Sequence, residues 1–369
     1  MQCVTNYSWV NLFTSPDQPA SPIVTQSFRV LRKHGEPLLM LPTSTSLAAQ
    51  ALSLYPAQSS FARMARFGLR QTLRCGLPVA TERAEVAIAT TASFPEFLRR
   101  LAGAETFPPV AILAGNPRQS GRRFLILVFN PQGQPATAVK AGMGQEAKDL
   151  ILSESSFLRS LPPKTPGIPR VREQFESDQL CAFAMDFVPG DSPRPSEISE
   201  VADLMTAWLD ESRSVGLSGL PAWQELARAA SPLFMRLDKQ LAGKLFHPAL
   251  THGDFAPWNI KVNANGRWVV LDWERGQLVG PPAWDWFHFV IQPAILVEKL
   301  SNTALAGRIE TLLTSPAFQS YAKAAGLNGW ERDWVLAYLL YCCDVIKPAE
   351  GLPQTSAVLE TLASKWLAN

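Results

Sequence analysis

The spacing of apolar positions divides the chain into a part rich in short strands and a part rich in helices. Short apolar runs bounded by turn-forming residues predict strands at residues 109–115, 122–130 and 135–142. The loops between them, AGNPRQSG and NPQGQ, are short enough to join antiparallel neighbours. Residues 145–161 then carry apolar side chains at helical spacing, and RVREQF and LCAFAMDFV return to a strand pattern. This order predicts an antiparallel meander, one amphipathic helix and two further strands.

Downstream of residue 197 the apolar spacing is mainly helical. A helix is expected to begin near Pro195 or Ser196, another to cover residues 221–242, and further helices to run from residue 291 to the end. Residues 249–273 are the exception, because ALTHGD, NIKV and RWVVLDW have the composition of strands. The sequence NANG between the last two predicts a hairpin turn.

The first hundred residues combine both patterns. EPLLMLPTS and EVAIATT predict strands, and helices are expected at residues 46–54 and 60–75. A later helix is expected to open at Ser93, with Glu96 three residues on as a capping box.

The helix at residues 60–75 carries arginines at helical spacing, at Arg63, Arg66, Arg70 and Arg74. A solvated face is the ordinary explanation for such a row, and an anionic partner or a membrane surface is the alternative.

Together these elements predict an α+β protein of two lobes with an N-terminal extension. We place an α/β extension at residues 1–80, a small lobe with an antiparallel sheet at 81–188, and a mostly helical lobe at 189–369. The segment PGDSPRPSE, residues 189–197, is expected to be the hinge. The extension could enlarge the small lobe, mediate dimerisation or shape a substrate entrance.

Composition narrows the classes of function. A chain of 369 residues with 47% apolar and 18% charged residues is typical of a globular protein with more than one core. A net charge of +2 gives no general attraction to nucleic acid, so no nucleic-acid partner is expected. The sequence has neither a run of 18 uncharged apolar residues nor a signal-peptide pattern. Its five cysteines form no disulfide or zinc pattern, and we expect a cytoplasmic protein without a membrane span.

The stretch THGDFAPWNI, residues 251–260, gathers polar side chains of the kind that perform catalysis. It places His252, Asp254 and Asn259 within one loop. The predicted hairpin returns Asp272 to the neighbourhood of Asn259, because the outer ends of antiparallel strands lie side by side. An amide oxygen from Asn259 and a carboxylate from Asp272 suit Mg2+, while Asp254 remains free to accept a proton from a hydroxyl group. The spacing of Asp254 and Asn259 matches the D-x-x-x-x-N of phosphoryl-transfer loops.

HGDFAPWN followed by VVLDWE resembles the aminoglycoside phosphotransferase and choline kinase-like superfamily, which has a protein-kinase-like fold. The later GPPAWDWFHF resembles a further segment of that superfamily, whose acid, here Asp285, is mainly structural. The resemblance covers roughly residues 107–290. It implies an ATP-dependent transfer with Mg2+, in which MgATP lies between the lobes.

The resemblance also implies roles for residues of the small lobe. Lys140 would bind the phosphates of ATP, oriented by a glutamate of the following helix, with Glu154 preferred over Glu146. The loop 115–121 would cover the phosphates, with Gly115 and Ser120 as candidate contacts, although it lacks G-x-G-x-x-G. The segment MDFVPG, residues 185–190 including Phe187, would be the hinge strand along which the adenine lies.

In the catalytic loop, Asp254 and His252 are the candidate catalytic residues. Asp254 is expected to act as the base, and His252 to orient the loop. His288 is interpreted as a packed histidine.

The expected reaction is transfer of the γ-phosphate of ATP to a hydroxyl group of a small molecule. A sugar, a polyol or an amino alcohol is favoured over an aminoglycoside, because residues 246–369 show no strong excess of acids. The alternative is an inactive, nucleotide-binding relative that regulates a protein partner. Metallophosphoesterases are disfavoured because their D-x-H and G-N-H elements are absent, and a protein kinase because DFG and A-P-E are absent. The oligomeric state and the choice between ATP and GTP stay open.

Overall fold

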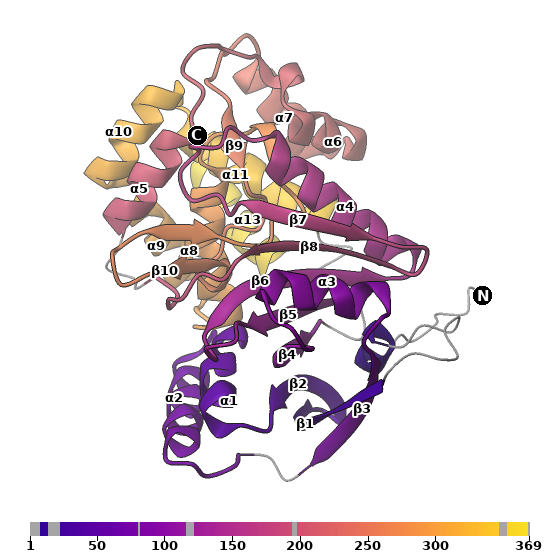
Figure 1. Ribbon diagram of the computed structural model, residues 1–369. Coiled ribbons are helices and arrows are strands. Elements are labelled where there is room, and N and C mark those ends of the chain that lie inside the picture. Colours follow the sequence, from indigo (N-terminus) through magenta and orange to yellow (C-terminus); the bar gives the residue numbers. More distant parts are fainter. Residues whose placement is uncertain are drawn as a thin grey trace, which may run out of the picture. The chain divides into compact units, whose positions relative to one another are not determined.

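The computed structural model describes residues 8–13, 23–79, 82–115, 122–193, 198–346 and 353–367. The chain forms two compact units. The first comprises residues 1–163, 168–191 and 262–266, and the second residues 164–167, 192–261 and 267–369. The predicted α+β class is confirmed, with a large sheet in the first unit and mostly helices in the second (Figure 1).

The first unit is built on one eight-stranded sheet in which neighbouring strands run antiparallel, in the order β3-β1-β2-β4-β5-β6-β8-β7. Its strands are β1 (Ile23–Lys33), β2 (Glu36–Pro42), β3 (Arg83–Ala89), β4 (Val110–Ala114), β5 (Arg123–Phe129), β6 (Pro135–Met143), β7 (Val171–Glu176) and β8 (Leu180–Asp186). The predicted meander is β4 to β6. Strand β1 was not predicted, and together with β2 it extends this sheet with residues from the first eighty of the chain.

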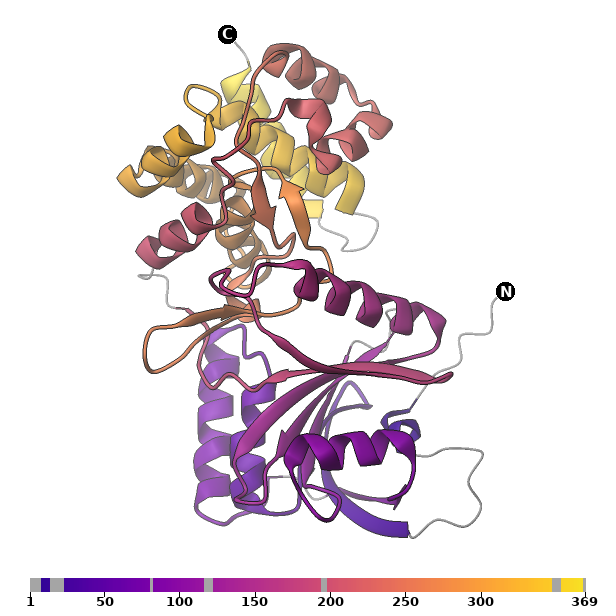
Figure 2. The ribbon, with the colours of Figure 1, turned by 45° about the horizontal axis from the view of Figure 1, so that its top comes forward.

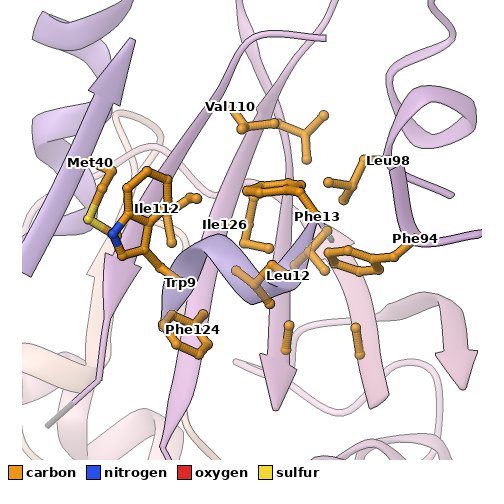
Figure 3. Close-up of a cluster of buried hydrophobic side chains, with 14 of the residues drawn as sticks. Trp9, Leu12, Phe13, Met40, Phe94, Leu98, Val110, Ile112, Phe124 and Ile126 are labelled. Atoms are coloured by element: carbon orange, nitrogen blue, oxygen red, sulfur yellow. The ribbon is translucent and has the colours of Figure 1, made fainter. Parts of the chain in front are cut away.

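Both faces of this sheet are covered, which explains the unbroken apolar run of β5. Alternate residues of β5, such as Phe124 and Leu127, belong to two separate cores. Figure 3 shows the first core, where side chains from the sheet meet Trp9, Phe13 and Phe94. The helices of this unit are η1 (Trp9–Leu12), α1 (Thr45–Ala51), η2 (Leu52–Leu54), α2 (Ser60–Arg74), α3 (Ser93–Ala102) and α4 (Gln145–Ser160).

The second unit contains helices and two small strand pairs, although Val262, the last residue of one strand, and the turn up to Gly266 belong to the first unit. Its helices are α5 (Ile198–Ala207), η3 (Leu217–Gly219), α6 (Pro221–Ala229), α7 (Pro232–Leu241), η4 (Pro257–Asn259), α8 (Trp284–Leu296), α9 (Asn302–Thr314), α10 (Pro316–Ala325), α11 (Glu331–Tyr341), the π-helical turn η5 (Cys342–Ile346) and α13 (Pro353–Trp366). The pairs are β9 (Ala249–Thr251) with β12 (Gln277–Gly280), and β10 (Ile260–Val262) with β11 (Trp268–Val270). Figure 2 shows the second unit in a turned view.

Three helix predictions were wrong in detail. The helix predicted at 221–242 is two helices, because Ala230 adopts a left-handed conformation and Ser231 caps α7, whose first residue is Pro232. Ser93 is the first residue of α3 rather than its cap, and Glu96 forms an ion pair with Arg99 instead of a capping box. Helix α8 begins at Trp284, seven residues before the predicted return of helices at 291. The predicted start at Pro195 or Ser196 and part of the predicted hinge lie outside the described residues.

No helix among the described residues is long and apolar enough to cross a membrane.

Replacing Phe124 by alanine is expected to destabilise the sheet unit by about 3–5 kcal/mol, because the ring is 1% exposed in the core of Figure 3. Urea unfolding measured by circular dichroism tests this. Phe61→Ala is the matched control, since Phe61 is 77% exposed, and its cost should stay within about 0.5 kcal/mol. Equal effects of the two substitutions would contradict the burial argument.

Candidate active site

The loop that follows β9 has a backbone that only glycine accommodates at one position. Gly253 has φ +78°, and a Cβ atom there would lie 2.8 Å from Cβ of Arg275. The position between His252 and Asp254 therefore requires glycine, because the backbone is left-handed and because Arg275 leaves no room for a side chain.

His252 is fully buried and fixed by hydrogen bonds at both ring nitrogens. The backbone N–H of Asp254 donates to Nδ1 (3.1 Å), and Nε2 donates to the carbonyl of Leu271 (2.9 Å). The ring of Trp273 packs against it with centroids 4.7 Å apart. With both nitrogens occupied, His252 is placed to hold the loop in shape rather than to exchange protons with a substrate.

Asp285, near the start of α8, holds the same loop from its other side. One carboxylate oxygen accepts the backbone N–H of His252 (2.5 Å), and the other accepts that of Gly253 (3.0 Å). Burial raises the pKa of this carboxyl group, against the opposing influence of His252 and of the two backbone hydrogen bonds. The carboxylate of Asp285 therefore fixes the backbone of this loop.

The carboxylate of Asp254 is partly accessible, with 30% of its side chain exposed. Its Oδ1 lies 2.9 Å from Nε2 of His288, and its Oδ2 accepts a hydrogen bond from Nδ2 of Asn259 (2.9 Å). Burial acts to raise the pKa of Asp254, but the hydrogen bond and electrostatic attraction of His288 and the attraction of His252 outweigh it. The net pKa therefore lies below the ordinary value. Each oxygen retains a second lone pair that can accept a proton.

His288 and Tyr338 are site residues that the sequence did not reveal. His288 is 2% exposed, and its Nδ1 lies 2.9 Å from the hydroxyl of Tyr338. Because the carboxylate of Asp254 accepts, the proton between it and His288 lies on Nε2, which leaves Nδ1 able to accept a hydrogen bond from the hydroxyl of Tyr338. Burial raises the pKa of Tyr338 well above its ordinary value. The interpretation of His288 as a packed histidine was incomplete, because the side chain is buried and also bonded to the candidate base. The motif gave no signal for Tyr338, which lies on α11.

Asn259 is oriented by its amide nitrogen. In addition to Oδ2 of Asp254, Nδ2 donates to the backbone carbonyl of Asp254 (2.9 Å). The opposite atom of the amide, Oδ1, is therefore the one that can coordinate a cation. The backbone N–H of Leu271 donates to the carbonyl of Asn259 (2.7 Å), which links this residue to the segment that leads to Asp272.

Asp272 occupies a backbone conformation that few residues adopt, with φ 72°. Aspartate and asparagine are the side chains that tolerate this left-handed region best after glycine. Its negative charge acts to raise the pKa of Asp254, so the two carboxylates lie within electrostatic range of one another.

The chemistry of these donors fits a magnesium ion. An amide oxygen from Asn259 and a carboxylate from Asp272 are hard oxygen donors, and Mg2+ usually combines one or two carboxylates with water and substrate phosphates. Among the described residues, no group of three or more His, Cys, Asp or Glu side chains is arranged to hold a metal ion.

In the first unit, the structure places Lys140 against Glu154. Nζ of Lys140 lies 2.5 Å from Oε2 of Glu154, and the two side chains are 13% and 2% exposed. Such a buried charge is costly without a partner, so the glutamate of α4 fixes the position of the lysine head group.

The other nucleotide-binding candidates are placed less favourably. The N–H of Gly115 donates to the carbonyl of Arg123 (2.8 Å), and a Cβ atom there would lie 2.6 Å from that oxygen, so its glycine is explained by strand packing. The N–H of Phe187 donates to Ala136 (3.1 Å), and its ring packs against the core beside α1. Neither amide is available to a nucleotide, and Ser120 lies outside the described residues.

A cavity of about 350 Å³ lies within the second unit beside the candidate base. Gly253 and His288, the neighbours of Asp254, form part of its wall. The remaining lining residues are Ala222, Thr251, Arg275, Gln277, Pro281, Trp284, Asp285, Tyr338, Tyr341, Val345 and Ile346. The wall is thus largely aromatic and aliphatic, with one basic side chain, Arg275, and one acid, Asp285, whose oxygens already accept backbone hydrogen bonds.

A family model described as the phosphotransferase enzyme family matches residues 79–327. Among solved structures, a thermostable mutant of aminoglycoside phosphotransferase APH(4)-Ia, in ternary complex with ADP and hygromycin B, is similar with 14% identity and a TM-score of 0.47. The match covers 74% of this chain and 99% of that one. Choline kinase LicA from Streptococcus pneumoniae is similar with 13% identity and a TM-score of 0.43, over 65% of this chain and 89% of that one. No curated protein matches the chain.

Proposed function

The chain belongs to the phosphotransferase enzyme family, and from this premise we propose that it transfers the γ-phosphoryl group of ATP to a hydroxyl group of a small molecule. The observation that carries the proposal is the arrangement around Asp254, whose partly exposed carboxylate is held by His288 on one oxygen and by Asn259 on the other. A carboxylate so fixed can orient a hydroxyl group and accept its proton.

In the proposed reaction, the acceptor O–H gives its proton to Asp254 while the acceptor oxygen forms a bond to the γ-phosphorus. The bond between that phosphorus and the β–γ bridging oxygen breaks, and ADP leaves. Lys140, held by Glu154, would bind the ATP phosphates. Mg2+, held by Asn259 and Asp272, would neutralise charge on the phosphates. The protein thus contributes mainly positioning and electrostatic stabilisation.

The cavity of the second unit supports a neutral acceptor, such as a sugar or a polyol. Aromatic walls from Trp284, Tyr338 and Tyr341 suit a sugar ring. A polycationic aminoglycoside would require several free carboxylates, whereas the lining offers Arg275 and an already bonded Asp285. An amino alcohol is the next candidate, because aromatic faces also attract an ammonium group.

The test is ADP release from MgATP over a panel of sugars, polyols, amino alcohols and aminoglycosides, with Asp254→Asn beside the wild type. A sugar or polyol that stimulates ADP release only in the wild type would support both the reaction and the acceptor class. Turnover with aminoglycosides alone would contradict the proposed acceptor class but would still support the proposed reaction. No turnover with any acceptor, despite measurable binding of MgATP, would favour an inactive relative that regulates a partner.

We further expect His288→Leu to lower kcat by about 10–100-fold, because a misplacement of about 1 Å at a reacting group can cost up to about 10²-fold in rate. Leucine cannot donate to Oδ1 of Asp254, so the carboxylate loses one of its two fixed contacts. The KM for ATP should stay unchanged, since His288 is bonded to the base and to Tyr338. Steady-state kinetics with the acceptor found in the panel measures both constants.

His288→Gln is the matched control, because its side-chain amide can still donate to Asp254, and kcat should return close to the wild-type value. Equal losses in the leucine and glutamine variants would indicate a packing role for His288 and contradict the positioning role.

A further inference from the structure

Helix α2 presents an apolar surface on the side that faces away from the core. Leu73 is buried, and Leu69 packs against the core that α1 and the sheet share. On the other side, Phe61, Met64 and Phe67 are 77%, 68% and 64% exposed. Because residues three apart are neighbours on a helix, these three side chains form one continuous line, which we call the outer stripe of α2. Figure 2 shows α2 beside α1 in the first unit.

The same helix concentrates positive charge. Between Ser60 and Arg74 it contains four arginines and no acidic residue, although the whole chain has a net charge of only +2. One of the four, Arg66, forms an ion pair with Asp191 (2.7 Å) and donates to the carbonyl of Tyr55 (3.2 Å), so it fastens the helix to its own unit. The remaining three are exposed.

Those three arginines form a row beside Phe67, the last residue of the outer stripe. Arg63, Arg70 and Arg74 are seven and four residues apart, spacings that return to nearly the same side of a helix. At 100° per residue, this row lies next to the position of Phe67 and opposite the positions of Ala65 and Thr72. Phe67 therefore lies between the arginine row on one side and Met64 and Phe61 on the other, so the exposed arc of the helix is cationic at one edge and apolar toward the other.

We propose that this face of α2 docks onto an anionic lipid surface. A helix that combines aromatic and aliphatic side chains with arginines, and has no acids, is suited to lie in the plane of a membrane interface. The apolar side chains would enter the acyl boundary, and the arginine side chains would reach the phosphate head groups. A lipid surface needs no shaped groove to receive a convex helix.

A second copy of this chain fits this surface less well. A twofold contact through α2 would place the arginines of one copy near those of the other, and such like-charge contacts are unfavourable. An acidic protein could neutralise the arginines, but it would also need an apolar groove for the outer stripe. Charge and shape together thus favour the lipid surface.

The test is cosedimentation of the full chain with vesicles of phosphatidylcholine alone and of an equal mixture of phosphatidylcholine and phosphatidylglycerol. We expect binding to the mixed vesicles only, and weaker binding as salt is raised, because salt screens the attraction. Replacing Arg63, Arg70 and Arg74 by glutamine should lower the partition coefficient about a hundredfold, since each basic residue near an anionic surface contributes roughly fivefold. Replacing Phe61, Met64 and Phe67 by serine should lower it by at least about tenfold.

Matched controls come from the second unit. Met235 and Leu245 are 60% and 63% exposed, close to the exposure of the outer stripe, so their replacement by serine should leave vesicle binding unchanged. Replacing the exposed Arg228, Lys239 and Lys323 by glutamine removes the same charge from another surface. It should lower binding much less than the α2 variant does.

Several outcomes would overturn the proposal. They are no binding to the mixed vesicles, equal binding to pure phosphatidylcholine, or an equal loss in the α2 variants and the controls. Binding to poly-glutamate without binding to vesicles would assign an acidic protein as the partner. A dimer in sedimentation equilibrium that the serine variant of the outer stripe dissociates, without vesicle binding, would assign a second copy.

Discussion

Asp254→Asn is expected to lower kcat by about 10²–10⁴-fold, the range that a positioned general base contributes, while nucleotide binding is retained. The amide is close in shape to the carboxylate but cannot accept the proton of the acceptor hydroxyl. Since Asp254 is bonded to His288 and Asn259 and is not one of the proposed metal ligands, the affinity for MgATP should change little. Single-turnover phosphoryl transfer and equilibrium binding of MgATP measure the two properties separately.

The neutral amide can accept a hydrogen bond from only one of the two donors that now meet the carboxylate, so a small loss of stability is also expected. A thermal unfolding curve with one transition like that of the wild type would show that the variant is folded. Turnover close to the wild-type rate in such a folded variant would remove Asp254 from the role of base.

Asp272→Asn is expected to abolish the dependence of nucleotide binding on Mg2+ and to lower kcat/KM by about 10²–10³-fold. A metal ion at the phosphates supplies several kcal/mol of charge stabilisation, and each 1.4 kcal/mol corresponds to tenfold in rate. The measurement is ATP affinity with Mg2+ and with a chelator. In this variant the two affinities should approach one another.

Asparagine is the informative replacement at this position. Asp272 has φ 72°, and asparagine tolerates this conformation, whereas alanine would add backbone strain to the loss of charge. The two asparagine variants control for each other, because Asp254→Asn should keep the response to Mg2+ that Asp272→Asn loses. An unchanged response to Mg2+ in Asp272→Asn would rule out Asp272 as a metal ligand.

The variants Asp254→Asn and Asp272→Asn also distinguish the proton-accepting role from the metal-binding role. His252 and Asp285 fix its backbone, as their hydrogen bonds to Leu271, Asp254 and Gly253 show. Substituting either of them should change every property of the loop together, in contrast to the selective effects expected at Asp254 and Asp272.

Local sequence was sufficient for the parts of this protein that depend on short-range geometry. The meander of β4 to β6, the helix α4 and the hairpin between β10 and β11 follow from apolar periodicity and turn residues. The convergence of Asn259 with Asp254 was predicted because the two lie five residues apart in one loop. The Lys140–Glu154 pair was implied by the family resemblance, and the two side chains are in contact in the structure.

Only the tertiary structure decided the contacts between residues far apart in sequence. His288 and Tyr338 are 34 and 84 residues from Asp254, and their hydrogen bonds depend on how α8 and α11 pack. Tyr338 belongs to no motif, and His288 lies in the segment GPPAWDWFHF, where only Asp285 was assigned a role. Nothing in the surrounding sequence distinguishes a buried histidine bonded to a base from one that only fills a core. The same reason explains why the amide of Gly115 is not available to a nucleotide, since it donates to the carbonyl of Arg123 on a neighbouring strand. A motif specifies which side chains a short loop presents, whereas packing specifies which distant partners hold them in place.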